Sequence, residues 1–268
     1  MDKMSLYFFG AAFLSLAVST LLYLWYLVKK GGRAGKYATL TNGLGFTFLT
    51  MSLLFRSIVA GRGPFSNQYE FALAFAWGVV LAYLYIEKSF KFRSLGVFVL
   101  PVALGLMAYA STIPSTIEPL VPALQNNLLL TVHVSVAVVA YGTFAVGFGA
   151  AVMYLYQSRG PASWMPSKDT LEEVSYRAVV IGFPMMILVL VLGALWANIA
   201  WGRYWGWDPK ETATLITTLL YASYLHAHNL RGWRGTRSAV LLILGFAAFV
   251  FTFFGNLFLG GLHSYSGL

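Results

Sequence analysis

Apolar residues occur in eight long runs along the chain, separated by short segments rich in basic or aromatic residues. Most runs approach or exceed the ~20 residues that a helix needs to cross a hydrocarbon layer of ~30 Å. Backbone groups in lipid must satisfy their own hydrogen bonds, so we expect these runs to be helices. The run 95–111 is short and contains Pro101. The predicted spans are 6–28, 40–60, 69–87, 95–111, 128–156, 178–199, 211–228 and 239–259.

This pattern predicts an all-α fold, a polytopic membrane helix bundle of about eight transmembrane helices. No internal repeat, low-complexity linker or soluble segment divides the chain, so residues 1–268 are expected to form a single integral membrane domain. The first apolar run shows no small-residue cleavage site and is long enough to remain as a span rather than act as a signal peptide.

The basic residues are distributed unevenly between two alternating sets of segments. By the positive-inside rule, the richer set faces the cytoplasm, which places both termini on the extracytoplasmic side. The membrane is then an inner (plasma) or thylakoid membrane, and the outer side a periplasm, a lumen or the cell exterior. The richer set comprises Lys29, Lys30, Arg33, Lys36, Lys88, Lys91, Arg93, Arg159, Lys168, Arg177, Arg231, Arg234 and Arg237, and the poorer set Lys3, Arg56, Arg62, Arg203 and Lys210.

Composition agrees with a membrane protein and excludes several kinds of chemistry. Hydrophobic residues make up 59% of the chain and charged residues 10%, against roughly 25% charged in a soluble domain. Lipid is therefore the expected environment, and the net charge of +9 reports orientation rather than nucleic-acid binding. The chain contains no Cys, which excludes disulfides, Cys-based metal sites and thiol redox chemistry.

One outward segment, about 196–211, is exceptionally rich in Trp and reads WANIAWGRYWGWDPKE. Gly202 and Gly206 allow sharp turns or close approach of a flat ligand. An interfacial aromatic belt accounts for one or two Trp, but four in one Gly-punctuated loop favour a platform for a large planar apolar molecule. The four rings are those of Trp196, Trp201, Trp205 and Trp207.

Asp208 and Pro209 close this segment and form a good helix start. We favour a helix-capping role for Asp208 over a direct role towards an acceptor protein.

Two of the four His residues are predicted to lie at the depth of the Trp platform. His133 falls about one turn inside the outer end of the fifth span, and His263 follows the eighth span. A single His near a helix end is usually a structural hydrogen-bonding residue. Two that converge on an aromatic platform can ligate a haem iron from opposite faces, because neutral imidazole is a common axial ligand.

The other two His lie in the seventh span, near the inner side. His226 is about 22 Å along the helix from Glu211, which makes it an intramembrane ionisable residue and a candidate ligand. His228 is closer to the basic inner loop, and contact with solvent or lipid headgroups explains it adequately.

Several motifs together resemble one family of haem-handling membrane proteins. WGRYWGWDPKET (201–212) resembles the WWD signature. The CcsA/ResC family of system II cytochrome c biogenesis is further indicated by GPFSNQYE (63–70), which matches its P-x-S-N-x-Y-E loop. YRAVVIGFP (176–184), YLHAH (224–228) and GLHSY (261–265) also resemble that family. The resemblance covers most of the chain beyond about residue 55. It departs at Ala213, where Trp is usual, and at His228, where Arg is usual.

The resemblance implies a role for each candidate residue. His133 and His263 would be the external iron ligands that flank the haem at the WWD loop. His226 would receive haem from the cytoplasmic side together with a histidine of the partner subunit, CcsB/ResB. The cargo would be haem b, transported as substrate. With its partner the chain would form a cytochrome c synthase (haem lyase), although no catalytic residue is assigned within it.

The implied function is haem export and ligation to apocytochrome c. The acceptor presents Cys-x-x-Cys-His, whose thiols add to the haem vinyl groups, and both sulfurs must come from the acceptor because this chain has no Cys. The haem propionates need polar or cationic partners at the outer side, and Glu70 either meets the ligand or orients a loop. The sequence does not choose among the candidate propionate partners Arg56, Arg62, Arg203, Lys210 and Asn198.

Three alternatives remain at this point. A transporter of another small molecule explains the helices but not the Trp loop and paired His. A b-type electron-transfer subunit usually has both ligands of each haem within its helices. A CcmC-type haem-delivery protein would be expected to have six spans and no P-x-S-N-x-Y-E loop.

Overall fold

The computed structural model describes residues 2–29, 32–121, 124–125, 127–160, 165–230, 232–255 and 258–263. Within these ranges all regular structure is helical, and each predicted apolar run corresponds to one helix. The helices are α1 Asp2–Val28, α2 Ala34–Ala60, α3 Gln68–Phe90, α4 Gly96–Ala110, α5 Asn127–Arg159, α6 Lys168–Trp201, α7 Pro209–Leu230 and α8 Thr236–Phe254. The prediction of an all-α polytopic bundle is confirmed.

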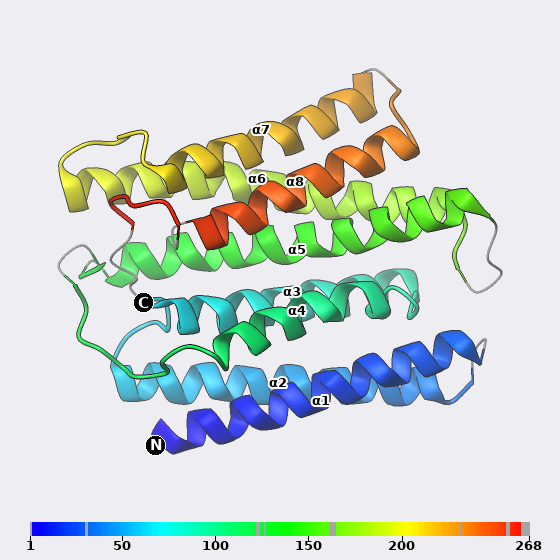
Figure 1. Ribbon diagram of the computed structural model, residues 1–268, viewed down its shortest axis with the longest axis horizontal. Coiled ribbons are helices and arrows are strands. Elements are labelled where there is room, and N and C mark those ends of the chain that lie inside the picture. The colour runs from blue at the N-terminus through cyan, green and yellow to red at the C-terminus, as the bar shows by residue number, and fades with distance from the viewer. Residues whose placement is uncertain are drawn as a thin grey trace.

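The helices run alternately in opposite directions along the long axis of the molecule (Figure 1). The N-terminal end of α1, the α2–α3, α4–α5 and α6–α7 connections and the segment after α8 gather at one end. This is the end that the distribution of basic residues assigns to the outer side. We call it the outer end, while its orientation in a membrane stays a prediction.

Six of the eight described helices are long and apolar enough to cross a membrane on their own: α1, α2, α3, α5, α6 and α8. The other two differ for identifiable reasons. Helix α4 has only 15 residues and contains Pro101. Helix α7 has 22 residues, but Thr, Tyr and His side chains occupy much of its buried face. Both therefore depend on packing against their neighbours.

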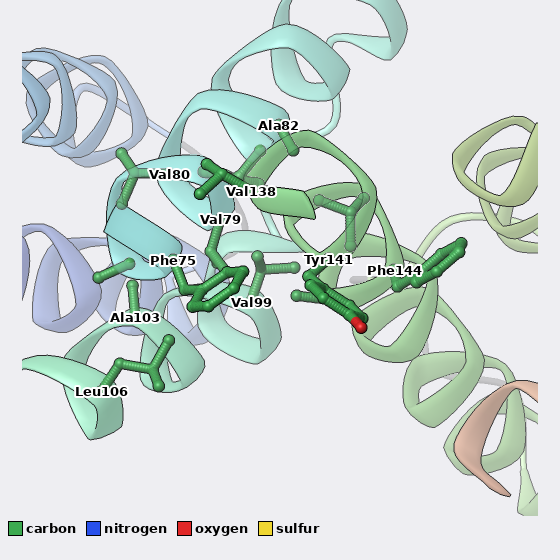
Figure 2. Packing of buried hydrophobic residues seen from close by; sticks show 14 of the residues in the cluster. Phe75, Val79, Val80, Ala82, Val99, Ala103, Leu106, Val138, Tyr141 and Phe144 are labelled. Atoms are coloured by element: carbon green, nitrogen blue, oxygen red, sulfur yellow. The ribbon is translucent and has the colours of Figure 1, made fainter. Parts of the chain in front are cut away.

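Helix α5 lies at the centre of the bundle and packs against α3, α4, α6 and α8. Figure 2 shows part of this core, where Phe75 of α3 meets Tyr141 of α5 edge to face, with ring centroids 5.4 Å apart. The α3 and α5 backbones approach very closely at Gly78 and Gly142. A Cβ atom on Gly142 would lie 2.3 Å from the carbonyl oxygen of Gly78, so only Gly fits there.

Candidate functional site

A cavity opens at the outer end between α3, α5, α6, α7 and α8. It encloses about 970 Å³ of space free of protein atoms, part of it open to the outside, and its walls are mainly apolar and aromatic. A pocket of this character is typical of a small-molecule or cofactor site. The lining residues are Gln68, Phe71, Phe75, Leu130, His133, Val134, Ala137, Tyr141, Val189, Leu190, Gly193, Ala194, Trp196, Tyr204, Trp205, Lys210, Glu211, Thr214, Phe249, Thr252, Phe253 and His263.

His133 enters the cavity from α5, close to the outer end of that helix. Its ring is nearly parallel to that of Trp196, with centroids 6.5 Å apart and planes inclined by 19°. Gly193 makes room for it, since a Cβ atom at that position would lie 3.1 Å from His133 Cε1. The buried Nδ1 atom makes no well-formed hydrogen bond with a described residue, and the imidazole interacts only weakly with the backbone of Val189. A buried polar nitrogen left without a bond costs free energy, which a ligand can recover.

His263 reaches the same cavity from the segment that follows α8, and Asp208 holds it there. His263 Nδ1 lies 2.7 Å from Asp208 Oδ2, and the backbone N–H of Leu262 donates to Asp208 Oδ1 at 2.6 Å. The imidazole also contacts Trp201 and Trp196, with ring centroids 4.9 and 5.7 Å away. Both His133 and His263 thus pack against Trp196.

Asp208 also caps α7, as the Asp-Pro sequence predicts. Its Oδ2 atom accepts a hydrogen bond from the backbone N–H of Lys210 at 3.1 Å. Glu211 completes a capping box, because its Oε2 atom accepts from the backbone N–H groups of Asp208 and Gly206. One carboxylate therefore starts a helix and orients an imidazole, and the sequence revealed only the first of these roles.

The protonation states of Asp208 and His263 suit metal ligation by His263. Burial raises the pKa of Asp208, but the hydrogen bond from His263 and the backbone donors outweigh it and bring the pKa down to about 2. Burial lowers the pKa of His263, against the opposing effect of the Asp208 carboxylate. At neutral pH Asp208 is therefore ionised and His263 neutral. With Nδ1–H donating to the carboxylate, Nε2 carries the lone pair, as in many metal-binding His residues.

The four Trp rings of the 196–211 segment form two edge-to-face pairs, Trp196 with Trp201 and Trp205 with Trp207. Trp196 is 3% exposed and lines the cavity, as does Trp205, while Trp201 packs edge to face on Trp196 at 5.0 Å. Trp207 is 69% exposed and lies outside the cavity. Its φ angle of 56° belongs to the left-handed region and turns the chain between Gly206 and Asp208.

The model of one protein family, described as cytochrome C assembly protein, matches residues 65–263. The chain belongs to this family.

The cytochrome c biogenesis protein CcsA of Synechococcus elongatus is 36% identical over 307 aligned positions, which cover 94% of each chain. The corresponding proteins of Gloeothece citriformis and Pyropia yezoensis are 35% and 33% identical, and the alignments cover 84% and 96% of this chain and 86% and 96% of theirs. Among solved structures, the cytochrome c haem lyase CcmF shares the fold, with a TM-score of 0.73 at 20% identity over 94% of this chain and 46% of CcmF.

In this family member, the loop with the P-x-S-N-x-Y-E pattern is organised by the fully buried Glu70. Arg56 Nε lies 2.7 Å from Glu70 Oε1, and Arg62 Nη1 lies 3.0 Å from Oε2, which also accepts from Ser66. Asn67 caps α3 by accepting from the backbone N–H of Glu70. Glu70 thus orients the loop and does not line the cavity.

Arg56 and Arg62 extend this network to the α4–α5 connection. Arg56 donates to the carbonyl oxygens of Ser115 and Thr116, and Arg62 to that of Glu118. Both guanidinium groups are therefore committed to joining loops at the outer end, and neither lines the cavity.

The two His residues of α7 lie on opposite faces of the helix, far from the cavity. His226 is exposed on the surface of the bundle, whereas His228 is buried. His228 Nε2 lies 3.2 Å from Glu172 Oε1, and the His228 ring stacks on Tyr176 at 4.6 Å. The interpretation of His228 as a solvent- or headgroup-exposed residue is therefore wrong. Helical phase explains this, because His228 follows the buried Tyr224 by four residues.

Proposed function

We propose that this protein presents haem at the outer side of its membrane for covalent attachment to apocytochrome c, as the CcsA-type subunit of a system II cytochrome c synthase. Its family membership supports a role in cytochrome c assembly. The observation that carries the proposal is the convergence of His133 and His263 on one apolar cavity, with Trp196 against both. In this proposal residues 1–268 act as one haem-handling domain with haem b as its cargo.

The cavity meets two chemical requirements of haem. The iron needs axial ligands, and two imidazoles from different elements are present. The porphyrin needs flat apolar walls, and Trp196, Trp205 and Phe71 are among the aromatic residues that provide them. In addition, the buried Nδ1 atom of His133 makes no well-formed hydrogen bond with a described residue, as expected where a ligand completes the site.

The position of His226 supports an entry site shared with a partner. An exposed imidazole in the inner half of a membrane bundle is expensive in lipid, so it is expected to face another polar group or a ligand. We propose that His226 and a histidine of a CcsB/ResB-type subunit together take up haem from the cytoplasmic side. The haem then moves to the outer cavity.

The attachment step requires no oxidant. Each Cys thiol of the acceptor adds across one haem vinyl group, so that a carbon–sulfur bond forms and the thiol hydrogen goes to carbon. This chain has no Cys, so both thiols belong to the acceptor. Its own residues hold the haem, exclude water and leave an edge accessible at the open side of the cavity.

Absorption spectroscopy of the purified protein, produced with its CcsB-type partner, tests the proposal. Wild type should show a haem spectrum, which His133→Gly and His263→Gly should each weaken and added imidazole should restore. His228→Gly is the matched control, because it removes a buried His that does not line the cavity. The assignment of the outer ligands fails if both cavity variants keep an unchanged spectrum.

Two other functions predict different results. A transporter of a non-haem molecule predicts no haem in wild type. A CcmC-type delivery protein predicts a normal haem spectrum, but no thioether-linked haem in an apocytochrome produced with this protein and its partner.

A further inference from the structure

The cavity contains a single Lys or Arg side chain among its described lining residues, that of Lys210. We propose that Lys210 binds a carboxylate of the molecule held in the cavity, which for haem is a propionate. This inference rests on the proposed function and adds the residue that recognises the acidic edge of the ligand. Lys210 lies in the first turn of α7, two residues after the carboxylate that holds His263.

None of the other described cations at the outer end lines the cavity, and the first of them, Lys3, lies in α1. Arg56 and Arg62 are paired with the buried Glu70. Arg203 is exposed on the α6–α7 connection and does not line the cavity. Asn198, the neutral candidate, does not line it either. Lys210 is therefore the described cation that an anionic group in the cavity would meet.

The acidic neighbours of Lys210 in the chain do not neutralise it by direct contact. Asp208 accepts from His263 and from the backbone of Leu262, and Glu211 accepts from the backbone of the loop that precedes α7. No described carboxylate lies within 4.0 Å of the Lys210 ammonium, whose Nζ atom lies 5.4 Å from the centre of the Phe71 ring. Asp208 attracts the ammonium group only from beyond contact distance, and a desolvated ammonium group is costly unless an anion pairs with it directly. A ligand carboxylate would supply that anion.

Titration of the haem-free full chain in detergent with haemin and with haemin dimethyl ester tests this inference. The ester keeps the iron, the ring and the vinyl groups but lacks the two negative charges. Wild type should bind haemin more tightly than the ester by about tenfold to a hundredfold, the range expected of a charge-assisted hydrogen bond. Lys210→Gln should remove this preference by weakening haemin binding, with ester binding almost unchanged.

Two further variants separate a charge effect from damage to the fold. Lys210→Arg keeps the charge and should retain most of the preference. Arg203→Gln removes an exposed cation from the adjacent α6–α7 connection and should retain all of the preference. The visible spectrum of bound haemin should be the same in Lys210→Gln as in wild type, because Lys210 is not proposed to ligate iron.

The possible failures are distinguishable. If wild type binds haemin and its ester equally, or if Lys210→Gln weakens both to the same extent, the carboxylate contact is wrong while the haem site stands. If wild type binds neither compound, both the proposed haem cavity and the proposed role of Lys210 are wrong.

Discussion

Asp208 and His263 are 55 residues apart in the chain, yet Asp208 Oδ2 lies 2.7 Å from His263 Nδ1. The contact joins the start of α7 to the segment after α8, which lie side by side at the outer end of the bundle (Figure 1). Through it, the Trp-rich loop fixes the orientation of a candidate iron ligand. The WWD-like loop therefore orients His263 and also supplies aromatic walls to the cavity.

Replacement of Asp208 by Asn should separate capping from ligand orientation. Asn caps helices about as well as Asp, so the stability of α7 should change little. The amide is a weaker acceptor for His263 Nδ1–H, and we expect haem affinity to fall by about tenfold to a hundredfold, the usual loss when a group that hydrogen-bonds a metal-binding His is replaced. Haemin titration measures the affinity, and thermal unfolding measures the stability. Equal losses of affinity in Asp208→Asn and Asp208→Ala would agree with a role of the Asp208 carboxylate in orienting His263. Unchanged affinity in Asp208→Asn would contradict that role.

Replacement of Glu70 by Gln should destabilise the protein strongly. It keeps the shape of the side chain but leaves Arg56 and Arg62 without their buried counter-charge. Removal of one partner from a buried ion pair typically costs about 3–5 kcal/mol. Chemical or thermal unfolding in detergent measures the loss. Glu118→Gln is a suitable control, because Glu118 is exposed and only its backbone carbonyl contacts Arg62. The haem spectrum of the folded Glu70→Gln protein should be normal, and a specific loss of iron ligation would contradict a purely structural role.

Replacement of Gly142 by Ala should push α3 and α5 apart. The added Cβ atom would lie 2.3 Å from a backbone oxygen of Gly78, and backbone cannot move aside as a flexible side chain can. Overpacking of this kind typically destabilises by about 1–3 kcal/mol. Gly105→Ala in α4 is the control, since a Cβ atom there meets nothing within 4 Å. Similar unfolding temperatures for both variants would show that the α3–α5 contact tolerates a side chain.

Replacement of His226 by Ala should impair the filling of the outer cavity without damaging the cavity itself. His226 lies on the exposed surface of α7, near the end of the bundle opposite the cavity, and does not line the cavity. We therefore expect less haem in protein isolated from cells but unchanged affinity for haemin added in detergent. Ser223→Ala, an exposed position about one turn away on the same helix, should change neither quantity. Weaker binding of added haemin by His226→Ala would contradict separate inner and outer sites.

The apolar runs alone located all eight helices. Run length explains the six helices that can span a membrane on their own, whereas α4 and α7 are visible only as weaker apolar runs. The ends of the helices were less well predicted. Helix α6 begins at Lys168, ten residues before the predicted span, because Ser167 caps it and helical hydrogen bonding continues beyond the apolar part. The clustering of His133, His263 and the Trp-rich loop at one end also followed from topology, since alternate connections of an up-and-down bundle share an end.

The rotation of each helix and the partners of each polar group were decided only by the tertiary structure. In a membrane helix both faces are apolar, so hydrophobic patterning does not reveal that His228 turns inward and His226 outward. The pairing of Asp208 with His263, the exposure of Trp207 and the position of Lys210 in the cavity depend on loops that meet in space. The sequence determined the helices and the end at which the candidate site lies, because both follow from local hydrophobicity and chain direction. Packing determined which side chains meet, because such contacts join residues distant in the chain.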